Sequence, residues 1–214
     1  MILIVGGTGR LGTLLVKRLA GRGHHVRILT RNPARAEQDV GGQITVMSGD
    51  VRDRPSLEPA VAGVETVVSA VHGFNDPARD SLAAVDRDGN ANLLSAARAA
   101  GAQFVLISTV GAAPDSPMEL FRMKYMAEER AVGSELPCTI VRATAFMELW
   151  IEVLEQTAGR SGRPLVFGQG QNLINFVSVG DVAALVERVV TDPGVRGETL
   201  EIGGPANLTF EQLA

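Results

Sequence analysis

Short apolar segments alternate with segments of helical spacing along most of this chain. The apolar segments, rich in valine and isoleucine, are residues 1–5, 25–29, 43–47, 64–71, 104–108 and 138–142. Several are apolar at consecutive positions, which is typical of parallel strands that helices cover on both faces. The helical segments between them are residues 11–20, 33–39, 57–61, 78–100 and 117–132. This alternation predicts an α/β fold with a doubly wound, mostly parallel sheet and right-handed crossovers.

The pattern changes after Arg142. Residues 146–159 are expected to form a helix, and residues 163–179 two short strands joined by a glycine-rich turn. A further helix begins at Asp181, which we interpret as its N-cap, and residues 199–202 are expected to form a last strand.

These patterns predict one compact domain with two parts. Residues 1–145 form the core, and residues 146–214 form a small substrate-side lobe that is interleaved with the last core strand. The chain ends in LTFEQLA, where Thr209 and Gln212 have the spacing of a capping box, yet almost no helix follows. Two explanations stand: the sequence is truncated, or a substrate-side segment is missing.

Composition narrows the class of protein. A length of 214 residues predicts one domain, and 45% hydrophobic residues supply a substantial core. The net charge of −4 provides no basic surface for nucleic acid. The single cysteine, Cys138, excludes an internal disulfide and a multi-cysteine metal site, and its apolar surroundings favour packing over nucleophilic chemistry. The first segment is too short for a secretory or membrane-spanning helix, so we expect a cytoplasmic monomer or homodimer.

The segment VGGTGRLG lies between the first predicted strand and the first predicted helix. It places Gly6, Gly9 and Gly12 where a backbone must approach a pyrophosphate closely, at a helix end whose N–H groups attract anions. Gly12 also allows close packing of the helix on the strand. The sequence therefore predicts a dinucleotide site here, and an ordinary tight turn is the alternative.

The residues after the second strand favour NADP over NAD. An NAD site usually has a carboxylate at this point, to bind the ribose 2′-hydroxyl. Here the chain has Arg31, with Arg35 one helical turn on and Arg10 in the glycine loop. Guanidinium groups suit a 2′-phosphate, whereas the alternative is that these arginines are solvated surface residues and that NAD binds.

Two other sets of residues have competing interpretations. Asp50 follows the third strand, where it either accepts a hydrogen bond from the adenine amino group or forms a turn or N-cap. Phe146, Met147 and Trp150 either line a pocket for an aromatic acceptor or form the buried face of their helix, and packing is the preferred interpretation.

Several longer segments resemble a known family. They are GGTGRLG, GDVRD, VDRDGNANLLSAARAAG followed by FVLISTVG, KYMAEERAVGSELPCTIVRATAFME and NFVSVGDVAALV, and they run in the expected order over essentially the whole chain. The sequence is similar to the atypical short-chain dehydrogenases of the NmrA-like type, and to isoflavone-reductase-like and quinone-reductase-like relatives. The resemblance implies a Rossmann fold, NAD(P) binding and a substrate pocket built from the C-terminal third. It leaves the activity open, because members include both reductases and regulators that bind the dinucleotide without turnover.

The resemblance also assigns residues. Together with the three arginines discussed above, it gives a predicted cofactor site at the ends of successive strands: Gly6, Thr8, Gly9, Arg10, Leu11, Gly12, Arg31, Arg35, Asp50, Val51, Ser69, Ala70, Val71 and Lys124. Lys124 and Ser108 match catalytic positions, and His72 is a further candidate proton donor at the same edge of the sheet. Asp86 departs from the family, since many extended relatives have asparagine there.

The largest departure concerns tyrosine. The family pattern Tyr-x-x-x-Lys places a tyrosine four residues before the lysine, but Leu120 stands there, and Tyr125 is rotated by about 100° from Lys124 on a helix. A simple ketone needs that tyrosine as an acid, whereas a quinone, flavin or enone spreads the incoming charge. Lys124 then binds the nicotinamide ribose and stabilises the oxyanion, or it merely pairs with Glu128 on the same helix.

Three functions follow in order of preference. The first is an NADPH-dependent reductase of a small conjugated, quinone-like or flavin acceptor. The second is a regulator that senses the dinucleotide without turnover, which the missing tyrosine also permits. The third, a nucleotide-sugar epimerase or dehydratase, is disfavoured because it requires the tyrosine. No metal, nucleic-acid or membrane partner is expected.

Overall fold

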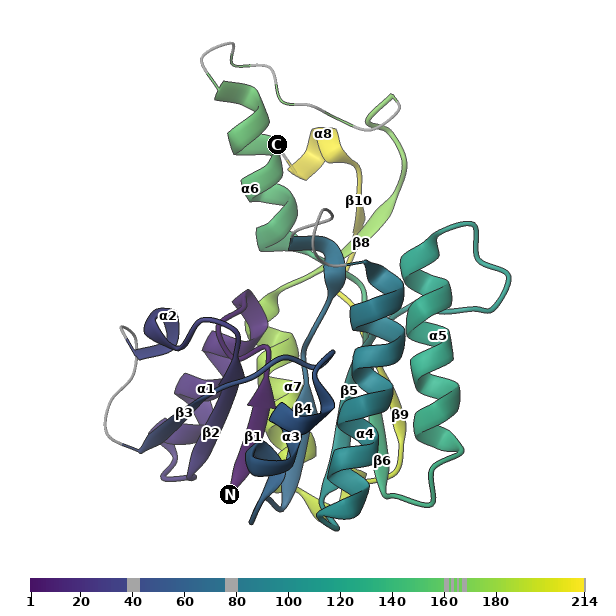
Figure 1. Ribbon diagram of the computed structural model, residues 1–214. Coiled ribbons are helices and arrows are strands. Elements are labelled where there is room, and N and C mark those ends of the chain that lie inside the picture. The colour runs from purple at the N-terminus through teal and green to yellow at the C-terminus, as the bar shows by residue number, and fades with distance from the viewer. Residues whose placement is uncertain are drawn as a thin grey trace.

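The centre of the protein is a seven-stranded sheet with the order β3-β2-β1-β4-β5-β6-β9, and every neighbouring pair in it is parallel (Figure 1). This computed structural model describes residues 1–37, 43–75, 81–159 and 169–213, together with Gly162, Pro164 and Val166. The strands are β1 (Ile2–Val5), β2 (Val26–Thr30), β3 (Ile44–Ser48), β4 (Thr66–Ser69), β5 (Gln103–Thr109), β6 (Cys138–Ala143) and β9 (Thr199–Ile202). The predicted doubly wound parallel sheet is confirmed.

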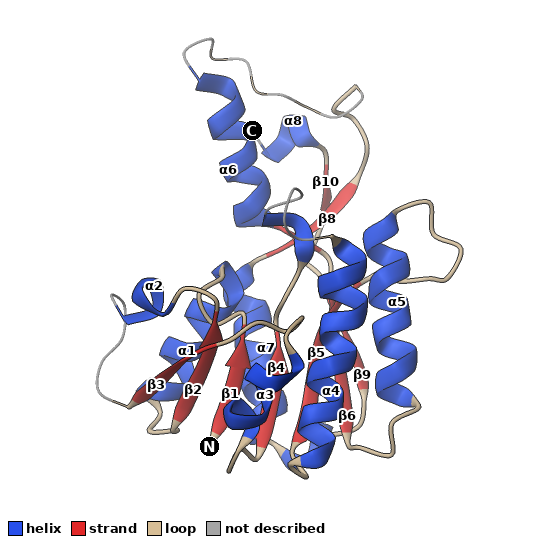
Figure 2. Ribbon diagram, in the orientation of Figure 1, coloured by secondary structure: helices blue, strands red, loops and turns tan. Residues whose placement is uncertain are grey.

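Helices cover both faces of the sheet, as Figure 2 shows. One face packs against α1 (Arg10–Gly21) and α7 (Val179–Thr191), and the other against α3 (Arg54–Val61), α4 (Asn90–Ala99) and α5 (Glu119–Val132). Side chains of a strand alternate between its faces, so Ile2 and Ile4 of β1 join the first cluster and Leu3 and Val5 the second. This explains why the strands are apolar at consecutive positions.

Two predicted helix boundaries differ from the structure. The single helix expected over 78–100 is divided, where it is described, into a π-helical turn, η2 (Ala83–Gly89), and α4. The assignment of Asp181 as an N-cap is wrong, because α7 begins earlier and Ser178 caps it by accepting a hydrogen bond from the Gly180 amide. Part of the short predicted helix at 33–39 is α2 (Pro33–Glu37), and the remainder lies outside the described residues.

A small lobe lies beyond the carboxyl ends of the core strands (Figure 1). It contains the strands β7 (Ala145–Phe146), β8 (Ile174–Val177) and β10 (Asn207–Leu208), with the helices α6 (Met147–Ala158) and α8 (Phe210–Leu213). The strand expected near 163–167 is not formed at Pro164 or Val166, and its other residues lie outside the described ones. The lobe's role on the substrate side stays a prediction.

The aromatic residues of the lobe pack together. Trp150 of α6 meets Phe210 edge to face with ring centroids 5.2 Å apart, and Met147 packs on the same cluster, whereas Phe146 packs against the core. The preferred interpretation, that Phe146, Met147 and Trp150 are packing residues, is therefore confirmed. The capping box is also confirmed, because the Thr209 amide donates to Gln212 Oε1 at 2.9 Å and the Gln212 amide to Thr209 Oγ1 at 3.1 Å.

Candidate active site

The strand order creates a crevice at the carboxyl end of the sheet. From the neighbouring strands β1 and β4 the chain turns in opposite directions, toward β2 and toward β5. The loops after Val5 and Ser69 therefore diverge, and such a switch point is where open α/β sheets bind ligands. The lobe stands over this end of the sheet (Figure 1).

The glycine loop occupies one wall of the crevice in close backbone contact. Gly6 has a φ of +88°, and a Cβ added there would lie 2.5 Å from the Ala70 carbonyl oxygen at the end of β4. A Cβ on Gly12 would lie 2.6 Å from the Gly7 Cα, so the first turn of α1 rests directly on the loop. The predicted close packing at Gly12 is confirmed, and any side chain here would displace the backbone.

The N-terminus of α1 points its amides at this loop. Its N-cap is Gly9, which has no side chain to cap the helix, and the first bond of the helix runs from the Thr13 amide to the Gly9 carbonyl. The preceding amides of Arg10, Leu11 and Gly12 are the ones that a helix cannot satisfy internally. Three converging N–H groups at a positive dipole end fit a pyrophosphate, so the chain has the cradle that a dinucleotide requires.

Hydroxyl and aliphatic side chains hold the loop in place. Thr8 Oγ1 lies 3.4 Å from Thr30 Oγ1, which joins the glycine loop to the end of β2. Leu11 is buried in the core face of α1, and Val51 is buried against Gly89. For Leu11 and Val51, therefore, the backbone alone is available to a ligand.

The three candidate arginines have different surroundings. Arg10 forms an ion pair with Glu152 of α6, which links the glycine loop to the lobe. Arg31, after β2, and Arg35, on α2, are both exposed, as a site for a 2′-phosphate requires.

Asp50 is engaged by its neighbour Arg52. The guanidinium donates from Nε to Oδ1 at 2.9 Å and from Nη2 to Oδ2 at 2.5 Å, and the Arg52 amide also donates to Oδ1. The hydrogen bond from Arg52, with a smaller Coulomb effect of Arg31, holds the pKa of the Asp50 carboxyl below its usual value. These contacts fit the interpretation of Asp50 as a turn-forming residue. If Asp50 also accepts a hydrogen bond from an adenine amino group, its carboxylate would be shared between the adenine and Arg52.

Lys124 lies inside the protein, with 7% of its surface exposed. Its Nζ lies 3.0 Å from Asp86 Oδ1 and donates to the carbonyl oxygens of Val71 at 3.0 Å and Ile107 at 3.1 Å. The alternative that Lys124 pairs with Glu128 is wrong, because Glu128 binds Arg142 instead. An ammonium has three N–H donors, and here three protein oxygens surround it. Lys124 thus joins the ends of β4 and β5.

Ser108 belongs to a second buried network. Its hydroxyl donates to Glu128 Oε1, and Arg142 donates to the same carboxylate from Nε at 3.1 Å and from Nη2 at 2.6 Å. The Glu128 carboxylate raises the pKa of Arg142, with a smaller contribution from Glu201. The Ser108 proton is therefore committed to a carboxylate within the protein.

Sequence reasoning named Asp86 only as a departure from the family, and it missed both the role of Asp86 beneath the crevice and Asn90. Asp86 is fully buried, and its Oδ2 accepts the Gly73 amide at 2.9 Å. Asn90 donates to the Asp86 carbonyl at 2.8 Å and accepts from Ser69 Oγ at 2.5 Å. The signal was present as two polar residues four apart in a buried segment. The π-helical turn that orients them was not predictable from helical spacing.

Four other residues were singled out from the sequence. His72 follows β4 and is exposed, with its ring centroid 6.4 Å from that of Phe74. Leu120 lies on α5 one turn before Lys124, and Tyr125 is half-buried beside Glu129, with its pKa raised by desolvation and by that carboxylate. Burial also raises the pKa of the Cys138 thiol, which suits a packing residue.

The described residues contain no group of three or more metal-ligating side chains that could hold an ion. Across the same parts of the chain, every helix is too short or too polar to cross a bilayer.

Known proteins resemble this chain along its length. A family described as NAD(P)H-binding matches residues 6–193. The NAD(P)H azoreductase of Xenophilus azovorans is 26% identical over 215 residues, which cover 100% of this chain and 71% of that protein. The photosystem II assembly factor Ycf39 of Trieres chinensis is 28% identical over 212 residues, covering 95% of this chain and 63% of that protein.

A solved structure agrees with the sequence comparison. The NADPH-dependent quinone oxidoreductase of Escherichia coli, in its complex with NADPH, superposes with a TM-score of 0.82 at 26% identity. The match covers 100% of this chain and 73% of that one. All three relatives are therefore longer than the chain described here.

Proposed function

The chain belongs to the NAD(P)H-binding family, and from that premise we propose that it is an NADPH-dependent oxidoreductase. In this proposal it transfers a hydride to a small conjugated, quinone-like or flavin acceptor. The observation that carries the proposal is the cradle formed by the glycine loop and the uncapped start of α1. Such a cradle accommodates a pyrophosphate and leaves the rest of the crevice to the two halves of a dinucleotide.

The strand ends would hold the cofactor as follows. The amides of Arg10, Leu11 and Gly12 bind the pyrophosphate, and the backbone of residues 69–71 lies beneath the adenosine. Arg31 and Arg35 are exposed beyond β2, where two guanidinium groups favour a 2′-phosphate. The NADPH named for the quinone oxidoreductase supports the same preference.

The acceptor class follows from what is missing on α5. Leu120 occupies the position of the tyrosine acid, so α5 offers no side-chain proton donor one turn before Lys124. Bound NADPH supplies the hydride. A quinone or enone accepts it and delocalises the negative charge, so that water or a weak donor completes the reduction with one proton. The names of the azoreductase and of the quinone oxidoreductase support such acceptors.

Within this proposal Lys124 acts chiefly by position. Its ammonium ties the Val71 and Ile107 carbonyls, so it fixes the ends of β4 and β5. To bind the ribose it must exchange one of these contacts, whereas its charge acts on a developing oxyanion without any exchange. His72 is the candidate for the proton in this proposal, because it follows β4 at the same edge of the sheet and its imidazole is exposed.

A second candidate function is a dinucleotide sensor without turnover. The specific observation in its favour is that the polar groups of Lys124 and Ser108 are already occupied by Asp86 and Glu128. One relative, the photosystem II assembly factor Ycf39, is named for a role in assembly and not for an enzymatic reaction, which also supports a function without turnover.

One experiment separates the two functions. Calorimetry first measures the binding of NADPH and NADH, and absorbance at the nicotinamide band then follows NADPH oxidation with benzoquinones, flavin mononucleotide, an azo dye and enones. Turnover with any acceptor that is lost in His72→Ala or Lys124→Met supports the reductase. Tight binding with no turnover across the panel supports the sensor, and absence of binding by both nucleotides refutes both.

A further inference from the structure

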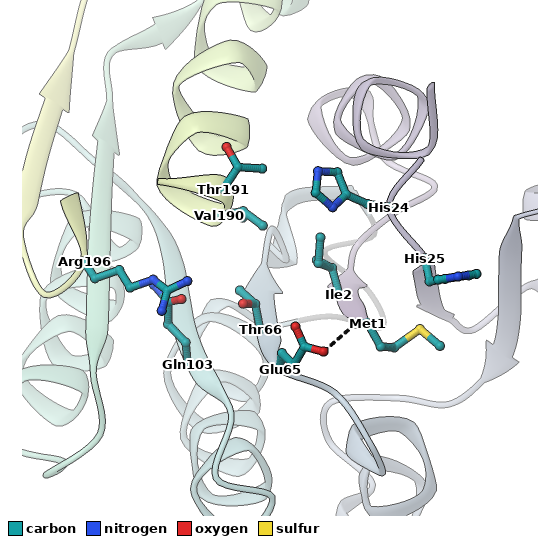
Figure 3. A pocket seen from close by; sticks show the side chains of 10 residues that line it. All are labelled: Met1, Ile2, His24, His25, Glu65, Thr66, Gln103, Val190, Thr191 and Arg196. Atoms are coloured by element: carbon teal, nitrogen blue, oxygen red, sulfur yellow. Dashed lines mark hydrogen bonds and ion pairs between the residues drawn. The ribbon is translucent and has the colours of Figure 1, made fainter. Parts of the chain in front are cut away.

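A second pocket lies at the opposite end of the sheet from the crevice. It has a volume of about 350 Å³ and opens at the amino ends of three neighbouring strands, where Ile2, Thr66 and Gln103 are lateral partners in β1, β4 and β5. The turn after α1 and the end of α7 complete its walls (Figure 3). We propose that this pocket binds a small apolar α-amino acid as a zwitterion.

The buried amide of Gln103 is the main observation. This side chain is only 8% exposed and lines the pocket, yet among the described residues neither its Oε1 nor its Nε2 has a hydrogen-bond partner. Buried amides in native proteins are nearly always paired, so an unpaired amide in the wall of a pocket marks where a ligand group would bind once the side chain turns into the pocket. Its oxygen and nitrogen together require both a donor and an acceptor from that ligand.

Charges around the pocket identify the two groups. Arg196 is exposed at the rim, with its guanidinium on the same side of the pocket as Gln103 (Figure 3). A guanidinium together with the Gln103 N–H donors suits a carboxylate. The only carboxylate among the lining residues, Glu65, already binds the Met1 amine at 3.2 Å, so it does not cancel the charge of Arg196.

The opposite wall suits an ammonium. Thr191 ends α7, and His24 follows the end of α1, so the negative ends of two helix dipoles meet there (Figure 3). An ammonium placed between these helix ends would also donate one N–H to Gln103 Oε1. Ile2 and Val190 are both buried and supply the apolar surface for a side chain. A molecule with a carboxylate, an adjacent ammonium and a short aliphatic side chain satisfies all of these groups.

L-Leucine is the test ligand, and two relatives that each lack one charge are its controls. Leucinamide lacks the carboxylate, and 4-methylpentanoate lacks the amine. At millimolar concentration leucine should raise the midpoint of thermal unfolding, because a ligand that binds only the folded state stabilises it, whereas the two controls should not. Calorimetry then gives the dissociation constant. No binding of leucine, or equal effects of all three compounds, overturns the proposal.

Two substitutions locate the site. Gln103→Leu and Arg196→Met should each weaken leucine binding by about tenfold or more, as expected when a charge-assisted contact is lost. Gln103→Leu should not lower the unfolding midpoint, because it replaces an unpaired buried amide with an apolar group of similar shape. Arg188→Met, an exposed arginine of α7 outside the lining residues, should leave binding unchanged.

Binding that survives both substitutions refutes the site. If Gln103→Leu folds poorly, Arg196→Met still tests the site, because Arg196 is exposed and its substitution should not disturb folding. NADPH affinity should remain unchanged in both variants, because the crevice lies at the other end of the strands. The outcome therefore does not depend on whether the proposed reductase activity is found.

Discussion

The two ends of the central sheet use glycine for different physical reasons. At the amino end, Gly23, Gly63 and Gly101 have positive φ angles, and a Cβ added to any of them would meet nothing within 4 Å. At the carboxyl end, a Cβ added to Gly6 or Gly12 would collide with backbone atoms. Glycines of the first kind let the chain turn, and those of the second kind let backbones touch. Only the crowded end is built to bring backbone N–H groups against a ligand.

Polar groups show the reverse contrast. Beneath the crevice, Lys124, Asp86 and Ser108 all bind protein partners, whereas Gln103 at the amino end has none among the described residues. Buried charges that bind one another keep a site rigid before a ligand arrives. If both proposals hold, the crevice would bind its ligand mainly through backbone groups, and the amino-end pocket would bind its ligand through side chains.

The largest effect should come from breaking the buried ion pair. Asp86→Asn leaves the Lys124 ammonium without a counter-charge, and we expect the free energy of unfolding to fall by about 3 to 5 kcal/mol. Urea denaturation measures it. The control is Asp88→Asn, whose pairs with Arg87 and Arg130 lie at the surface, where solvent screens them, so its loss of stability should be far smaller. Equal losses in the two variants would show that the buried pair has no special role.

The glycine contrast can be tested within one helix. Gly12→Ala should lower stability by about 1 to 3 kcal/mol and weaken NADPH binding by more than about tenfold, because the added Cβ displaces the loop. Gly21→Ala, near the other end of α1, has open space and should be neutral or stabilising by up to about 1 kcal/mol. Thermal unfolding and calorimetry report both quantities. NADPH binding that persists unchanged in Gly12→Ala would contradict the proposed cradle.

A smaller effect is expected at the 2′-phosphate. Arg31→Ala should reduce the preference for NADPH over NADH by about tenfold, since one charged hydrogen-bonding partner contributes about 1.5 kcal/mol. The two dissociation constants from calorimetry give the ratio. Arg54→Ala, an exposed arginine at the start of α3, is the matched control. Equal affinity of the unaltered protein for NADPH and NADH would refute the assignment of NADP.

The smallest effect concerns the link between the loop and the lobe. Glu152→Gln should release Arg10 for a phosphate and tighten NADPH binding about twofold to fivefold, because exposed pairs contribute less than about 1 kcal/mol. Glu155→Gln, on the exposed side of α6, should have no effect. Weaker NADPH binding in Glu152→Gln would instead mean that the lobe must hold Arg10 in place for the cofactor.

Much of the architecture was predictable because it depends on local patterns. The alternation of apolar strands and helices led to the correct sheet, and VGGTGRLG led to the correct loop, since both signals lie within a few consecutive residues. The boundary at Ser178 was missed because serine and aspartate are both good N-caps and stand three residues apart. The partners of Lys124, Ser108 and Arg10 were not predictable from local patterns, because each partner lies on a different element.

The sequence by itself determined the elements, the order in which they alternate and the glycine loop. Only the tertiary structure decided that Lys124 binds Asp86, that Ser108 binds Glu128 and that Gln103 has no partner in the described protein. The physical reason is that hydrogen bonds and ion pairs depend on distances of a few ångströms between residues on different elements. Strand pairing and the π-helical turn set those distances, and residue spacing along the chain does not encode them.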